Sequence, residues 1–134
     1  MERKRLTPVV LVVDDDEDWR SFAQEVLEPD YTVEVAASGK EALAAVRNHA
    51  PDLIILDVMM PGGLDGFGTL CELRKNAATR AIPVIMLTGV NAAMGTRFDR
   101  EELERYLGVA PSAFLEKPIP PADLIAEVAR LLSA

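Results

Sequence analysis

Cysteine and histidine are almost missing from this sequence, which contains one of each, Cys71 and His49. One cysteine cannot form an internal disulfide or a cysteine metal cluster, and such sparse use is typical of a reducing compartment. One histidine gives little support to a histidine metal cluster or a histidine-based catalytic dyad. We therefore expect a cytoplasmic protein in which Cys71 is a small core residue and His49 ends a helix before Pro51.

Basic residues are also in short supply. Fourteen Lys and Arg against twenty-two Asp and Glu give a formal net charge of −8. This excess of acid disfavours direct binding to nucleic acid or to an anionic membrane. Long apolar runs are absent as well, since residues 8–13 are too few for a signal-peptide core or a membrane span. We expect no targeting segment and no membrane association.

The length of 134 residues limits the number of domains. It falls within the range of about 100–200 residues that is usual for one domain. Hydrophobic residues make up 49% of the chain, which is enough to build a core. We expect one domain over residues 1–134, with its core at about 8–132, a basic tail at 1–7 and no output domain.

Five short apolar runs, rich in β-branched residues, predict strands. They are Val9–Val13, Thr32–Ala36, Leu53–Leu56, Val84–Leu87 and Ala113–Leu115. Runs without polar alternation indicate strands buried on both faces, which is typical of a parallel sheet.

Helical patterns lie between these strands, with apolar residues at three- and four-residue spacing. Ser38 with Glu41 resembles a capping box, Asp65 is a candidate N-cap, and Pro121 opens the last helix. A further helix is expected over residues 101–107, capped by Asp99 with Glu102 and ended by Gly108, while residues 89–97 before it show no clean helical period. Alternating strands and helices predict the α/β class, a doubly wound five-stranded parallel sheet with helices on both faces.

Polar residues follow the carboxyl ends of four of these strands. Asp14 and Asp15 follow the first, Asp57 the third, Thr88 the fourth and Lys117 the fifth. Ligands of such sheets bind at this edge. Clustered carboxylates repel one another, so they suggest a divalent cation, and ligands that are all oxygen suit Mg²⁺. An ammonium and a hydroxyl beside them suit a phosphoryl group. The pattern predicts phosphoryl chemistry on Mg²⁺, with a carboxylate as the nucleophile.

These residues belong to a set of motifs that resembles the receiver domain of bacterial two-component response regulators over nearly the whole chain. The motifs are Val12–Asp15, Leu56–Pro61, Asp65–Gly66, Leu87–Gly89 and Glu116–Pro118. The resemblance implies a flavodoxin-like fold with strand order 2-1-3-4-5. It also implies a phosphoacceptor, not an enzyme, that is phosphorylated by a sensor histidine kinase or a phosphotransfer protein, and the length leads us to expect the stand-alone type. The phosphorylated form would then bind a downstream protein, as a monomer or a phosphorylation-dependent dimer.

The resemblance assigns roles to the residues of the pocket. Asp57 would accept the phosphoryl group, and Lys117 would pair with Asp57 at rest and with the phosphoryl group afterwards. Asp15 would bind Mg²⁺ directly, Asp14 largely through water, and Met59 through its backbone carbonyl.

The resemblance also implies a conformational switch and a docking surface. Thr88 would hydrogen-bond a phosphoryl oxygen, and the ring of Phe114, which has no hydroxyl, would respond by packing alone. The Lys117–Pro118 peptide is expected to be cis. A kinase would dock over the pocket, with these candidate specificity contacts on the first helix: Asp16, Glu17, Arg20 and Gln24.

Three features depart from the family pattern. The segment Pro61–Asp65 is one residue longer than usual, and the stretch from Thr88 to Lys117 is several residues longer. Met59 and Val90, at positions that usually modulate hydrolysis, are apolar and cannot hydrogen-bond an attacking water. We therefore expect a long-lived phosphorylated form.

Three other readings of the acidic motifs remain open. A Mg²⁺-dependent aspartyl-phosphate phosphatase would use Asp14 as nucleophile and Asp16 as acid–base, but the chain lacks the later acidic pair and cap domain of such enzymes. A receiver-like module could also bind partners without phosphorylation. A calcium-binding EF-hand starting at Asp14 is disfavoured, because Trp19 stands where that loop needs glycine.

Overall fold

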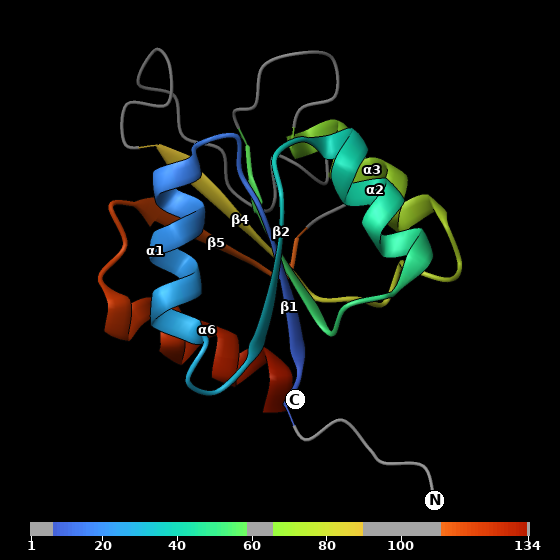
Figure 1. Cartoon of the computed structure of the whole chain (residues 1–134). Coiled ribbons are helices and arrows are strands. Elements are labelled where there is room, and N and C mark those ends of the chain that lie inside the picture. Colours follow the sequence, from blue (N-terminus) through green and yellow to red (C-terminus); the bar gives the residue numbers. More distant parts are fainter. Residues whose placement is uncertain (1–6, 59–65, 90–110, 134) are drawn as a thin grey trace, which may run out of the picture.

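Five parallel strands form a single sheet with helices on both faces (Figure 1). The computed structural model describes residues 7–58, 66–89 and 111–133. The elements are β1 (Val9–Val13), α1 (Glu17–Leu27), β2 (Thr32–Ala36), α2 (Gly39–Asn48), β3 (Leu53–Asp57), α3 (Gly66–Lys75), β4 (Val84–Gly89), β5 (Ala113–Lys117) and α6 (Pro121–Ser133).

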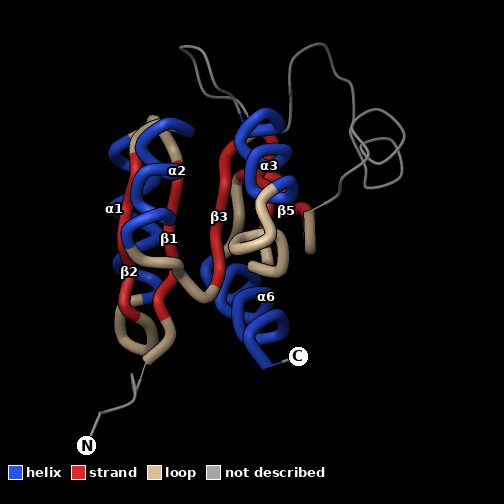
Figure 2. The backbone as a smooth tube through the Cα atoms, turned by 90° about the vertical axis from the view of Figure 1, so that its right-hand side faces the viewer, coloured by secondary structure: helices blue, strands red, loops and turns tan. Residues whose placement is uncertain are grey.

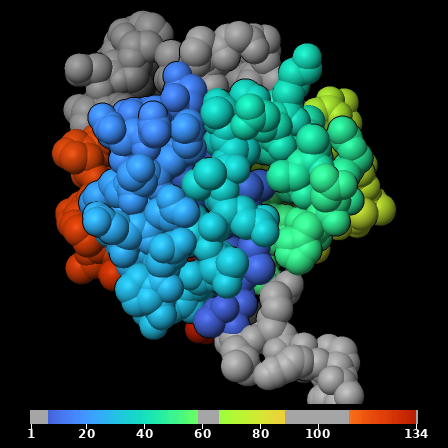
Figure 3. Space-filling model, in the orientation of Figure 1, coloured from blue at the N-terminus to red at the C-terminus, as the bar shows by residue number. Residues whose placement is uncertain are grey.

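The strands lie in the order β2-β1-β3-β4-β5, as predicted. Every neighbouring pair is parallel, so all the carboxyl ends meet at one edge of the sheet. Helices α1 and α6 cover one face, and α2 and α3 cover the other (Figures 1 and 2). The edge strand β2 lies between the surfaces of α1 and α2 in Figure 3, and its Val35 is 45% exposed.

The core is divided into two layers by the sheet. Successive residues of a strand point to opposite faces. Val10 and Val12 accordingly join the cluster beneath α1 and α6, while Leu11 and Val13 join the cluster beneath α2 and α3. All five residues of β1 and of β3 are buried, which confirms the two-sided burial predicted from their apolar runs.

The helix boundaries follow from capping side chains. Ser38 accepts a hydrogen bond from the N–H of Glu41 at 3.1 Å, as a capping box requires. The Glu41 carboxylate, however, accepts from the N–H of Ala37, one residue before the position that a capping box predicts. Helix α2 ends at its C-cap His49, and α6 begins with Pro121, both as predicted.

Three strands extend further than their apolar runs predicted. Asp57 pairs with Leu87, and Thr88 and Gly89 pair with Glu116 and Lys117. The prediction that Asp57, Thr88 and Lys117 lie just beyond the strands was therefore wrong. Backbone pairing with neighbouring strands, and not side-chain hydrophobicity, decides where each strand ends. The three polar side chains consequently stand on the sheet itself.

Two predicted features, the N-cap at Asp65 and the helix over 101–107, lie outside the described residues. Within the described ranges, no helix has both the length and the apolar character that crossing a bilayer would require.

Neighbouring residues of α6 allow a test of the core. Leu124 is fully buried, whereas Ile125 is 39% exposed. We expect Leu124→Ala to lower the free energy of unfolding by about 2–5 kcal/mol, because it leaves a cavity. Ile125→Ala should change it by less than about 0.5 kcal/mol. Urea denaturation measures both values, and equal losses would contradict this assignment of the core.

Candidate functional site

The sheet register brings three carboxylates together. Val13 of β1 pairs with Leu56 of β3, so the residues that follow them, Asp14 just after β1 and Asp57 at the end of β3, lie at the same edge. Asp14 is fully buried, Asp57 is 6% exposed, and the neighbouring Asp15 is exposed to solvent. One oxygen from each of the three carboxylates lies within 4.8 Å of the others. The predicted cluster is therefore present, with one open side at Asp15.

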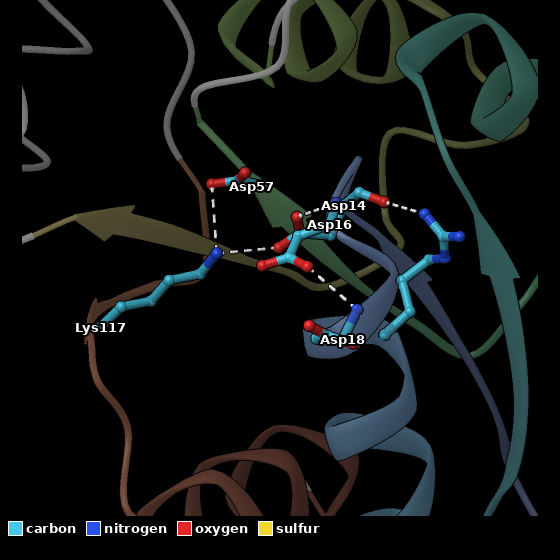
Figure 4. A network of polar contacts seen from close by, with 6 residues as sticks. Asp14, Asp16, Asp18, Asp57 and Lys117 are labelled. Carbon is cyan, nitrogen blue, oxygen red and sulfur yellow. Dashed lines mark hydrogen bonds and ion pairs between the residues drawn. The ribbon is translucent and has the colours of Figure 1, made fainter.

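Lys117 places its ammonium between two of these acids (Figure 4). Its Nζ donates a hydrogen bond to Asp14 Oδ2 at 2.9 Å and lies 3.9 Å from Asp57 Oδ1. The predicted pairing with Asp57 exists as a longer ion pair, but sequence reasoning missed the shorter contact with Asp14. Among the residues that the structure describes, the three carboxylates of the cluster exceed the Lys117 ammonium by two formal negative charges.

The remaining polar atoms of Asp14 fix its position. Its N–H donates to the carbonyl of Ala36, and its Oδ1 accepts from the N–H of Asp16 at 2.9 Å. Its carbonyl oxygen accepts from Nη1 of Arg20 at 2.8 Å. Arg20, predicted from the sequence as a kinase contact, thus has an intramolecular partner at the site.

Asp16 is the N-cap of α1. Its Oδ1 accepts a hydrogen bond from the N–H of Asp18 at 2.9 Å (Figure 4), and Glu17 with Asp18 makes an acidic first turn. Negative charge is favourable at this end of a helix. Because helix α1 begins at Glu17, an EF-hand loop does not form here. The capping bond also occupies the carboxylate that a phosphatase would use as its acid–base.

Gly66 packs directly against the backbone that follows Asp57. A Cβ at this position would lie 2.2 Å from the carbonyl oxygen of Asp57 and 2.7 Å from Cα of Val58. Its N–H donates to the carbonyl of Val58 at 3.1 Å. The sequence predicted a helix start here, which is confirmed, but it gave no sign of this close approach.

The remaining site residues occupy the predicted strands. Thr88 is half-buried and follows Leu87, the residue that pairs with Asp57. Phe114 pairs with Met86 and packs, partly buried, against the core beneath α2 and α3. The Lys117–Pro118 peptide is cis, as expected. Three sequence predictions, on Met59, Pro61–Asp65 and Val90, lie outside the described residues.

Trp19 is a residue of the site that sequence reasoning missed. The Lys117 ammonium lies 5.1 Å from the centre of its ring. Trp19 also packs, partly buried, against the core beneath α1 and α6. No spacing rule connects residue 19 with residue 117, so only the folded chain reveals the contact.

The donor set fits Mg²⁺. All the ligand atoms offered are carboxylate oxygens, which this small, hard cation prefers, and the open side at Asp15 leaves room for the waters that it retains. Asp14, Asp15 and Asp57 are the described residues that would hold it.

Comparison with known proteins agrees with this geometry. The sequence model of the response regulator receiver domain matches residues 10–129. The chain belongs to this family. Among solved structures, the Vibrio cholerae chemotaxis protein CheY4 is 31% identical, with a TM-score of 0.79 over 93% of this chain and 98% of that one. The receiver domain of NtrX from Brucella abortus is 30% identical, with a TM-score of 0.78 over 93% of this chain and 98% of that one. Receiver domains are signalling phosphoacceptors, which supports this reading over a phosphatase.

Curated relatives extend beyond the receiver domain. Response regulator Rre1 from Synechocystis is 38% identical over 126 residues, which are 92% of this chain and 51% of Rre1. PleD from Caulobacter vibrioides is 40% identical over 123 residues, which are 91% of this chain and 25% of PleD. This chain therefore spans about half the length of one of these relatives and a quarter of the other.

Mg²⁺ should stabilise this receiver domain, because it relieves the repulsion among the carboxylates. At ten times its dissociation constant a ligand adds about 1.4 kcal/mol, which raises Tm by about 3–6 °C in a domain of this size. We expect that rise to shrink in Asp15→Asn and to persist in Asp30→Asn, which alters an exposed acid of the α1–β2 turn. Thermal unfolding with Mg²⁺ or EDTA measures it, and an equal rise in both variants would contradict the site.

Proposed function

We propose that Asp57 is the residue on which this receiver domain accepts a phosphoryl group from the phosphohistidine of a sensor histidine kinase or phosphotransfer protein. The observation that carries the proposal is the position of Asp57 in the sheet. It ends the central strand β3, with Asp14 directly after β1 on one side and Thr88 on β4 on the other. A group attached to Asp57 would therefore have the acids and the hydroxyl on opposite flanks.

The transfer is a displacement at phosphorus. A carboxylate oxygen of Asp57 forms a bond to phosphorus, the phosphorus–nitrogen bond of the phosphohistidine breaks, and its electron pair stays on the imidazole. Bound Mg²⁺ would neutralise charge on the phosphoryl oxygens. The Asp57 side chain must approach with its negative charge partly balanced, and Lys117, at 3.9 Å, supplies a positive charge for this.

Lys117 would then take a second role. Once Asp57 carries a phosphoryl group, the strongest negative charge lies on the transferred oxygens, and we propose that the ammonium follows it and weakens its bond to Asp14. Thr88 would donate its hydroxyl proton to a phosphoryl oxygen. Phe114, on the neighbouring strand, would repack in response and alter the surface that a downstream protein contacts.

We retain the four residues of α1 as kinase-contact candidates, but the structure separates them into two kinds. Glu17 is exposed on the first turn, and Gln24 lies two turns further along, half-buried. Asp16 caps the helix, and Arg20 binds the carbonyl of Asp14. Exchanging Asp16 or Arg20 would thus disturb the pocket as well as any docking surface. The downstream partner, the oligomeric state and the cytoplasmic location stay predictions.

The first test concerns the acceptor. Incubating the chain with acetyl phosphate and Mg²⁺ should add one phosphoryl group in the wild type and none in Asp57→Asn, because an amide is not a nucleophile here. Intact-protein mass spectrometry measures the addition, and Asp30→Asn is the matched control. Undiminished labelling of Asp57→Asn would place the acceptor elsewhere.

The second test concerns kinase choice. Replacing Glu17 and Gln24 with the residues of another receiver should change the rate of phosphotransfer from a panel of kinases by about tenfold or more, while the rate with acetyl phosphate stays within about twofold. A change of about tenfold corresponds to about 1.4 kcal/mol, within reach of a few interface contacts. Unchanged kinase rates would reject these two positions, and a parallel loss with acetyl phosphate would indicate damage to the pocket.

A further inference from the structure

The Lys117 ammonium touches more than carboxylates. It lies 2.9 Å from Asp14 Oδ2 and 5.1 Å from the centre of the Trp19 ring, so it is held between an acid and an aromatic ring. The face of an indole carries negative electrostatic potential and attracts cations more strongly than the ring of tyrosine or phenylalanine. The lysine side chain is only 23% exposed, which reduces screening of this attraction by water.

The position of the ring does not depend on Lys117. Trp19 lies in the first turn of α1, whose start is fixed by the Asp16 cap, and it packs against the core beneath α1 and α6. Its ring also contacts that of Phe22, with centres 5.7 Å apart and planes inclined at 56°. The helix therefore presents the ring at a fixed place, and the flexible lysine side chain is the partner that moves.

A divalent cation competes with this arrangement. Mg²⁺ at the cluster would draw on the carboxylates of Asp14, Asp15 and Asp57, and that of Asp14 already accepts a hydrogen bond from Lys117 through Oδ2. The cation would also repel the ammonium. Any contact that holds Lys117 beside Asp14 therefore stabilises the ion-free site and weakens Mg²⁺ binding.

We propose that Trp19 is a positioning residue that holds the Lys117 ammonium beside Asp14 in the resting site and thereby sets the affinity of the acidic cluster for Mg²⁺. This deepens the proposed function, since it concerns the lysine that serves Asp57. Trp19 acts through Lys117 and touches neither the cation nor the phosphoryl group. The contact between its ring and the Lys117 ammonium must break before Mg²⁺ can take the place of that ammonium at the carboxylates.

Calorimetric titration with Mg²⁺ alone tests the proposal. Trp19→Leu removes the ring and should tighten Mg²⁺ binding about three- to tenfold, the change in equilibrium constant that a cation–π contact typically produces. Trp19→Phe keeps an aromatic face and should stay within about twofold of the wild type. Tyr31→Leu is the matched control, because Tyr31 packs against the same core and follows the other end of α1; its Mg²⁺ affinity should not change.

The same titration in a Lys117→Met background separates positioning from packing. Without the ammonium, Trp19→Leu should no longer alter Mg²⁺ affinity, because the ring has no cation to hold. An effect of equal size in that background would overturn the proposal, as would wild-type affinity in Trp19→Leu itself.

Trp19 is the only tryptophan of the chain, which provides a second readout that needs no change to the ring. Mg²⁺ should change the tryptophan fluorescence of the wild type, and Lys117→Met should lose most of that change. If Trp19→Leu fails to fold, this comparison decides the matter, and an undiminished change in Lys117→Met would refute the proposal. These measurements use no phosphodonor, so they can fail while Asp57 proves to be the acceptor, and the reverse.

Discussion

The burial of a negative charge at Asp14 is the constraint on which the site depends. A fully buried carboxylate is costly unless it is paired and hydrogen-bonded. Asp14 meets this requirement with one distant and one local partner: the ammonium of Lys117 on β5, and the backbone N–H of Asp16, the N-cap of α1. The end of β1, the first turn of α1 and the last strand must therefore be correctly placed together. The geometry of the pocket follows from that requirement.

The excess of negative charge at the site favours the binding of a cation. The parallel register of the sheet brings Asp14 beside Asp57, and in the described part of the chain the ammonium of Lys117 lies within ion-pair distance of both. A site with balanced charges would gain little from a cation. This one is left with a deficit of positive charge, which Mg²⁺ can remedy, and the lysine must then find a new partner. The resting structure thus already contains the competition that phosphorylation would resolve.

The sequence predicted those features whose physical signal lies in residues adjacent along the chain. Apolar runs located all five strands, and the motifs around Asp14, Asp57 and Lys117 identified the family and its strand order. The ends of β1 and β2 were predicted correctly, but those of β3, β4 and β5 were misjudged, because ladder pairing continues past the last apolar residue. Within the described residues, the contacts of Trp19 and Arg20 could not be predicted either, since each joins a helix residue to an atom that only the tertiary fold brings near.

The close contact at Gly66 couples the start of α3 rigidly to the backbone of Asp57. Where most helices rest on a sheet through side chains that can rotate aside, the start of α3 meets the peptide after Asp57 backbone to backbone. Backbone atoms have no rotamers with which to absorb a displacement. The first turn of α3 and the carbonyl of Asp57 therefore behave as one rigid joint. Position 66 accepts no larger residue unless the strand that carries Asp57, or the helix itself, is displaced.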